Sequence, residues 1–172
     1  MTPAARPAHR LPAIATEPAA VAAIAADLEA AGFTVERLDS LWGTEAAASL
    51  HRGSRVAALR ALASRESSPL ATLATLFVLG LPVSRAHADA AFPSAGVDRV
   101  VAAGLLRSDT APETDTDEAD TDDSGLPLDP ADALVHPTVD LRPYAFVDDL
   151  GAGSWWIVSD LGELALGTAL GE

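Results

Sequence analysis

The sequence predicts a mainly helical α+β protein, in which a helical amino-terminal region precedes a winged-helix-like region with a small β wing. Three observations predict this class. Hydrophobic residues make up 49% of the 172 residues, which is sufficient for a buried core. Short apolar segments with helical spacing fill residues 16–104, and most end at glycine or proline. Segments typical of β-strands begin only after them, at Leu105.

The chain divides into four expected segments. Residues 1–15 contain three prolines and no helical period, which predicts a flexible tail. Residues 16–66 should form the amino-terminal helical region, and residues 67–163 the winged-helix-like region. Residues 164–172 would begin a linker to a further domain.

Three helices are expected in the amino-terminal region. Thr16 and Thr44 are suitable caps for the first two helices, and the third would bury a stripe of Val56, Leu59 and Leu62. The predicted helices are Glu17–Ala31, Thr44–Leu50 and Arg52–Ala63, with an irregular stretch at Phe33–Ser40.

The winged-helix-like region should contain three more helices and three strands. Its first helix is apolar nearly all round, which predicts the central helix of the core. Short helices with tight turns, followed by strands, are typical of a winged helix-turn-helix. The predicted helices are Leu70–Leu79, Arg85–Ala91 and Val97–Ala103, and the predicted strands are Leu105–Ser108, Leu134–Leu141 and Trp155–Ser159.

The net charge of −14 is concentrated in one segment between two wing strands. Residues 109–132 hold ten of the 25 acids and no base, whereas the remainder has 15 acids and 11 bases. Few large apolar residues lie in this segment, so burial cannot offset its ordering entropy, and we predict a disordered insert. The folded body should have no general field that attracts nucleic acid.

The cysteine, histidine and hydropathy patterns restrict the cellular compartment and the kinds of site that we expect in the chain. The chain has no cysteine, which excludes disulfides and thiolate metal sites. Its histidines have no metal-ligand spacing, so we expect no metal site. The apolar segment Leu70–Leu81 is about half the length of a membrane span, and no signal-peptide layout occurs. These patterns predict a cytoplasmic protein with no membrane partner.

Two segments near the carboxyl end are the most informative, Val139–Tyr144 and Trp155–Glu163. Together with the leucine-rich segments at 69–73, 76–80 and 102–106, they resemble the amino-terminal region of actinobacterial class I S-adenosylmethionine (SAM)-dependent methyltransferases. The catalytic half of that family is similar to HemK-type and small-domain methyltransferases. The resemblance runs from about Ala20 to the last residue, and the pairing of DLRPY with WWIVSDLGE is its distinctive part.

The resemblance implies a substrate-recognition domain, cut off before the catalytic core. The complete protein would transfer a methyl group from SAM to a nitrogen of RNA, DNA or a protein, and the missing carboxyl-terminal methyltransferase domain would be the main partner. The Rossmann-like core is absent from this sequence: Gly151–Gly153 precedes an aromatic strand instead of joining a strand to a helix, so it is not a cofactor loop. We therefore expect no catalytic, cofactor-binding or metal-binding residue in this chain.

Five residues are candidates for contact with substrate or with the missing domain: Arg142, Tyr144, Trp155, Trp156 and Asp160. Arg142 has a second interpretation, as a strand-end arginine paired with Asp140 or Asp160. Trp155 and Trp156 are adjacent on a predicted strand, so their rings should point to opposite faces, one into the core and one outward. An outward tryptophan would suit a domain interface or a stacked base.

Two other functions compete with the methyltransferase interpretation. A free-standing winged-helix DNA-binding regulator needs a basic recognition helix, but Val97–Ala103 carries one arginine and one aspartate among apolar residues. A protein-interaction module is the second, in which an exposed tryptophan and the acidic insert contact a partner.

Overall fold

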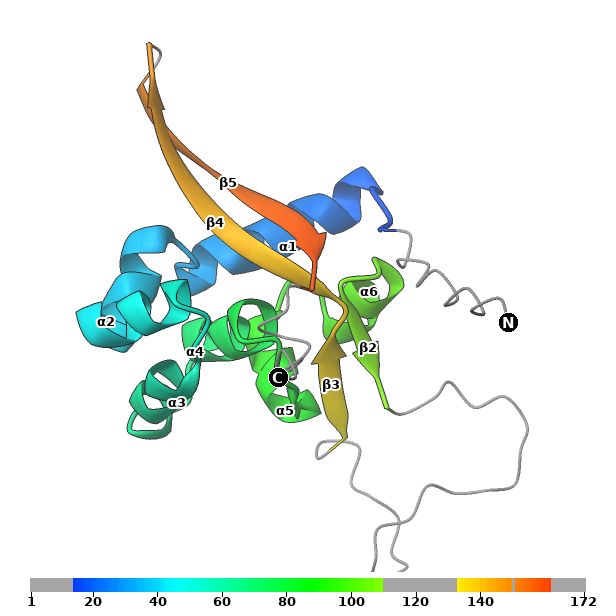
Figure 1. The fold of residues 1–172 in the computed structure, drawn as a ribbon. Coiled ribbons are helices and arrows are strands. Elements are labelled where there is room, and N and C mark those ends of the chain that lie inside the picture. Colours follow the sequence, from blue (N-terminus) through cyan, green and yellow to red (C-terminus); the bar gives the residue numbers. More distant parts are fainter. Residues whose placement is uncertain (1–13, 110–132, 150, 162–172) are drawn as a thin grey trace, which may run out of the picture.

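The computed structural model describes residues 14–109, 133–149 and 151–161, and these form an α+β fold (Figure 1). The strands form two small antiparallel sheets, and they begin earlier than the predicted Leu105, because Val83–Ser84 is a strand that precedes the last two helices. Apart from Ile14, Ala15 and Asp109, the predicted tail and acidic insert lie outside the described residues, as does the predicted linker. The elements are α1 Pro18–Ala31, α2 Val35–His51, α3 Val56–Ala63, α4 Pro69–Leu73, η1 Ala74–Val78, β1 Val83–Ser84, α5 Arg85–Ala91, α6 Val97–Ala102, β2 Leu106–Ser108, β3 Leu134–Pro137, β4 Val139–Asp148 and β5 Gly151–Asp160.

The first two helices begin at caps other than the predicted ones. Glu17, not Thr16, caps α1, because its carboxylate accepts from two backbone N–H groups of the first turn. The irregular stretch predicted at Phe33–Ser40 is wrong, because Thr34 caps α2 and helical residues begin at Val35. Gly43 is not helical, with φ of 77° and ψ of 169°, so α2 consists of two helical segments that meet in a kink there, and the second contains the predicted helix Thr44–Leu50.

Helix α3 buries a different face from the predicted stripe. Ala58 is fully buried, whereas Val56 is 54% exposed and Leu59 36%. The small side chain of Ala58 faces the core, where a larger one would hold the helix further out. Of the predicted stripe, only Leu62 packs against the core, and it is half-buried.

The prediction of a central core helix is confirmed by α4 and η1, which form one continuous apolar helix. Its second half is a π-helix, in which the Leu79 N–H donates to the Ala74 carbonyl five residues earlier. The wider turn directs more side chains inward than an α-helix would, so Leu76, Phe77 and Leu79 are all buried.

A three-stranded antiparallel sheet of order β1-β3-β2 lies beside α5 and α6. The predicted single strand Leu134–Leu141 is wrong, because Thr138 divides it between two sheets. The Thr138 hydroxyl donates to the Gly104 carbonyl at 2.6 Å, and its N–H donates to the Leu105 carbonyl. The chain therefore leaves the first sheet at Thr138 and starts a separate hairpin.

That hairpin consists of β4 and β5, paired in one register along their whole length. Its base belongs to the core, where Val139 and Leu141 are buried. Its far end extends away from the helices (Figure 1).

A buried carboxylate joins α1 to the turn before α6. Asp27 is 1% exposed and accepts hydrogen bonds from the backbone N–H groups of Ser94 and Ala95, the shortest at 2.8 Å. Side chains of both predicted regions share one hydrophobic cluster, which extends from Ile24 to Leu141.

No single helix of the described residues is long and apolar enough to cross a membrane. The pair α1 and α2, bent by 47°, meets the length and composition criteria only when both helices are taken together.

Candidate functional site

The β4–β5 hairpin brings the two most informative sequence segments together as partner strands. Directly opposed residues of an antiparallel pair share a face. Pro143 opposes Trp156 on the inner face, and Tyr144 opposes Trp155 on the outer face. The hairpin thus has one side packed on the body and one side turned away from it.

The inner face is fixed by Trp156. Its ring is half-buried, and its indole Nε1–H donates to the Phe33 carbonyl at 2.9 Å. The prediction that the two tryptophan rings point to opposite faces is confirmed, and Trp156 is the inward one.

The outer face is apolar and exposed. Tyr144 is 51% exposed, Trp155 60% and Ile157 42%. The Phe146 ring lies 4.5 Å from the Trp155 ring and covers Gly153, where any side chain would overlap it. Aromatic residues gathered on one exposed face are typical of an interaction surface.

The other two candidates of the sequence lie toward the base of the hairpin. Arg142 forms an ion pair with Asp140, with its Nε at 2.9 Å from one carboxylate oxygen and a further bond from Nη2. This is one of the two partners considered for it. Asp160, the other, ends β5 opposite Val139 and is exposed.

A hollow of about 500 Å³ lies between the outer half of the hairpin and the start of α2. Thr34, Val35 and Glu36 line one wall, and residues 143–147 and 152–154 line the other. Its only charged lining residue among the described ones is acidic, so it does not suit an anionic ligand.

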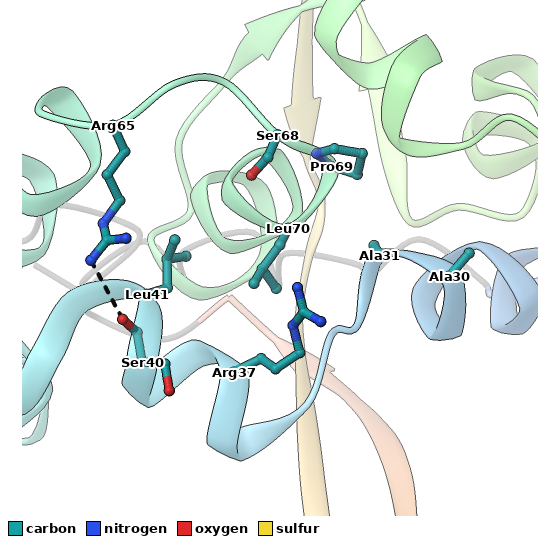
Figure 2. A pocket seen from close by; sticks show the side chains of 9 residues that line it. All are labelled: Ala30, Ala31, Arg37, Ser40, Leu41, Arg65, Ser68, Pro69 and Leu70. Atoms are coloured by element: carbon teal, nitrogen blue, oxygen red, sulfur yellow. Dashed lines mark hydrogen bonds between the residues drawn. The ribbon is translucent and has the colours of Figure 1, made fainter.

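A second hollow, of about 570 Å³, contains the residues that sequence reasoning missed (Figure 2). It lies between α2 and the start of α4, and no acidic side chain of the described residues lines it. Two arginines do: Arg37 from α2 and Arg65 from the loop after α3. The surplus of arginine between residues 37 and 65, in an acidic chain, was the available signal. The lining residues are Ala30, Ala31, Arg37, Ser40, Leu41, Arg65, Ser68, Pro69 and Leu70.

Several charged side chains around α5, α6 and the first sheet form ion pairs, whereas Arg99 on α6 bonds to the Ser94 carbonyl. Arg85 lies 3.0 Å from the carboxylates of both Asp89 and Asp98, and its pKa is raised, chiefly by the hydrogen bond to Asp98. Asp109 lies 2.7 Å from both Arg107 and His136. The hydrogen bond from His136 is the main cause that lowers the pKa of the Asp109 carboxyl.

No cluster of three or more metal-ligating side chains occurs in the described ranges. Residues 30–117, slightly more than half of the chain, match a family described as a domain of unknown function (DUF7059). The chain belongs to the DUF7059 family. The DUF7059 match runs from the end of α1 past β2, so it contains the whole arginine-lined hollow and excludes the hairpin. No curated protein and no solved structure matches the chain.

Proposed function

We propose that this chain is the substrate-recognition domain of a SAM-dependent methyltransferase that acts on a nucleic-acid or protein nitrogen. One observation carries the proposal. The two segments that resemble the methyltransferase family pair strand to strand, and they present Tyr144, Trp155 and Ile157 on one exposed face. An apolar face of this kind is buried when a second domain packs against it.

In this function the chain selects and orients the methyl acceptor. The catalytic domain supplies SAM, and its chemistry depends on holding the acceptor nitrogen close to the methyl group and in line with it. Trp156 and the base of the hairpin fix the direction of the two strands relative to the helical body. The outer face would therefore meet the catalytic domain in one orientation.

We assign the segment from α4 to β3 to a winged-helix unit. Its order is helix, strand, helix, helix and two strands, and the sheet order β1-β3-β2 is that of a winged helix. This order favours a second candidate function, a free-standing DNA-binding regulator. The charge pairs oppose it, because Arg85, Arg107 and His136 already contact carboxylates that would repel a phosphate backbone.

The decisive experiment uses the complete product of the reading frame that encodes this chain. We expect a methyltransferase core in that product and transfer of labelled methyl groups from SAM. Trp155→Ala should lower kcat/KM by about tenfold or more, because the aromatic ring that would pack against the catalytic domain is lost. Val147→Ala is the matched control, since Val147 is 83% exposed and lies on the other face of the same hairpin. A reading frame without such a core, or equal kcat/KM for the two variants, contradicts the proposal.

Calorimetric titration separates the roles of the two parts. The 172-residue chain alone should give no heat of SAM binding, whereas the complete product should bind SAM. Micromolar binding by the short chain would contradict a purely substrate-selecting role.

A further inference from the structure

The hollow between α2 and α4, here called the arginine groove, is cationic in a strongly acidic chain. Its lining contains Arg37 and Arg65 and no acidic side chain among the described residues, although the chain has a net charge of −14. We infer that the arginine groove binds the phosphates of a single-stranded nucleic acid. This inference rests on the proposed function and names the substrate class that the domain would select.

The two arginines are available for an anionic ligand. Within the described residues neither makes an ion pair: Arg37 has no hydrogen-bond partner for its guanidinium, and Arg65 reaches only the Ser40 carbonyl, at 3.5 Å. By contrast, Arg85, Arg107 and Arg142 all contact carboxylates. A guanidinium without a carboxylate partner retains the donors that bind a phosphate through two parallel hydrogen bonds.

The end of α1 leaves room for the Arg37 side chain beside the groove. The Arg37 side chain passes so close to Gly32 that a methyl group there would overlap its Cδ and Nε atoms. Gly32 also ends α1 in the left-handed conformation, with φ of 68°. One glycine thus ends a helix and leaves the space that the Arg37 side chain occupies.

The groove also has an apolar wall, which distinguishes a nucleic acid from a free phosphate. Leu41 and Leu70 lie between the two arginines, and Pro69 is beside them (Figure 2). A nucleic-acid strand alternates phosphates with sugar and base rings, so it can place phosphates on the arginines and a sugar or base against the exposed Pro69. A phosphopeptide offers one phosphate and no such alternation.

Fluorescence anisotropy with the 172-residue chain and a labelled single-stranded RNA of mixed sequence tests the inference. We expect affinity to fall between about 50 and 200 mM salt with a log–log slope of about −1.4, the value for two neutralised phosphates on a single strand. Arg37→Gln and Arg65→Gln should each weaken binding about tenfold. Arg37→Lys should restore part of the loss, because it keeps the charge without the planar fork.

Arg99→Gln is the matched control, because Arg99 is exposed on α6, bonds only to the Ser94 carbonyl and carries the same charge. It should bind RNA like the wild type, and thermal unfolding should show all variants folded. Equal affinity of the wild type and the Arg37 and Arg65 variants overturns the inference. So does a larger effect of Arg99→Gln, which would indicate a winged-helix DNA site, or tighter binding of a phosphoserine peptide than of RNA.

The inference and the proposed function fail in different ways. The inference depends on Arg37 and Arg65, whereas the proposed function depends on Trp155 and on the complete reading frame. RNA binding that is unaffected by the arginine variants, alongside methyl transfer impaired by Trp155→Ala, would overturn only the inference.

Discussion

The helix pair α2–α3 and the region from α5 to β3 differ in how several of their arginines are paired. In the second region Arg85 and Arg107 lie within 3.0 Å of carboxylates, so carboxylates of the same chain already neutralise much of their charge. In the first, Arg37 and Arg65 border a hollow without a carboxylate partner among the described residues. In the proposed winged-helix unit the only arginine that lacks a carboxylate partner among the described residues is Arg99, whereas two such arginines line the arginine groove. The helix order alone therefore does not locate the anion-binding surface, and the pairing of charges favours the arginine groove.

Loss of the Asp27 carboxylate should destabilise the contact between α1 and the turn before α6. Asp27→Ala removes the charged acceptor of the Ser94 N–H and leaves the buried Ala95 N–H without a partner, so we expect the free energy of unfolding to fall by about 3 kcal/mol. Urea denaturation measures the change. Asp39→Ala removes an exposed carboxylate from α2 and should change stability by less than about 0.5 kcal/mol. Comparable losses for the two variants would show that Asp27 does not link the regions.

The two tryptophans of the hairpin extend the comparison to its two faces. Trp156→Phe removes the hydrogen bond to the Phe33 carbonyl and should lower the free energy of unfolding by about 1 kcal/mol. Trp155→Phe keeps an aromatic ring on the exposed face and should cost less than about 0.5 kcal/mol. Denaturant unfolding followed by far-ultraviolet circular dichroism compares them without relying on tryptophan emission. An equal cost for both would mean that the outer face is also structural.

Release of Arg85 from its carboxylates would make the α5–α6 face resemble the arginine groove. In a chain that already carries Arg37→Gln and Arg65→Gln, adding Asp89→Asn and Asp98→Asn should raise RNA affinity about threefold at low salt, because the Arg85 guanidinium becomes available. Glu45→Gln with Asp160→Asn makes the same change in net charge elsewhere and is the control. If both pairs of substitutions raise RNA affinity equally, net charge alone explains the difference between the two regions.

Acid should weaken the paired region slightly through Asp109. Its pKa is lowered mainly by the bond to His136, so its contribution is present above the ordinary carboxyl pKa and is lost as pH falls through the lower folded value. Because Asp109 is 44% exposed, we expect its contribution to the free energy of unfolding to be less than about 0.5 kcal/mol. Unfolding measured from neutral pH to about pH 3 should show a shallower decline for Asp109→Asn than for the wild type. A decline of equal slope would contradict this assignment.

Local signals predicted those parts of the fold that local chemistry determines. The nearly all-round apolar pattern of residues 70–79 placed the central helix. Alternation along a strand predicted that the two tryptophan rings would diverge. The inward ring was not identifiable, because the Phe33 carbonyl that receives Trp156 is 123 residues away in the sequence.

The features that sequence reasoning missed depend on contacts between distant segments. Thr138 divides two sheets because it bonds back to Gly104, a pairing that alternation within residues 134–141 does not reveal. The α3 stripe was misplaced because Ala58 faces the core and, of the larger residues, only Leu62 packs against it. The arginine groove requires Arg37 and Arg65 to meet across two elements, whereas in the sequence they are simply two exposed arginines.

The π-helical turn at the end of the central helix makes the first sheet sensitive to the length of the chain before it. Removing one residue from Ala74–Val78 would let the segment close with ordinary α-helical bonds, and everything after it would rotate by about 100° around the helix axis. Val83, only a few residues further on, would then no longer face Val135. Insertions and deletions should therefore be tolerated poorly in this turn.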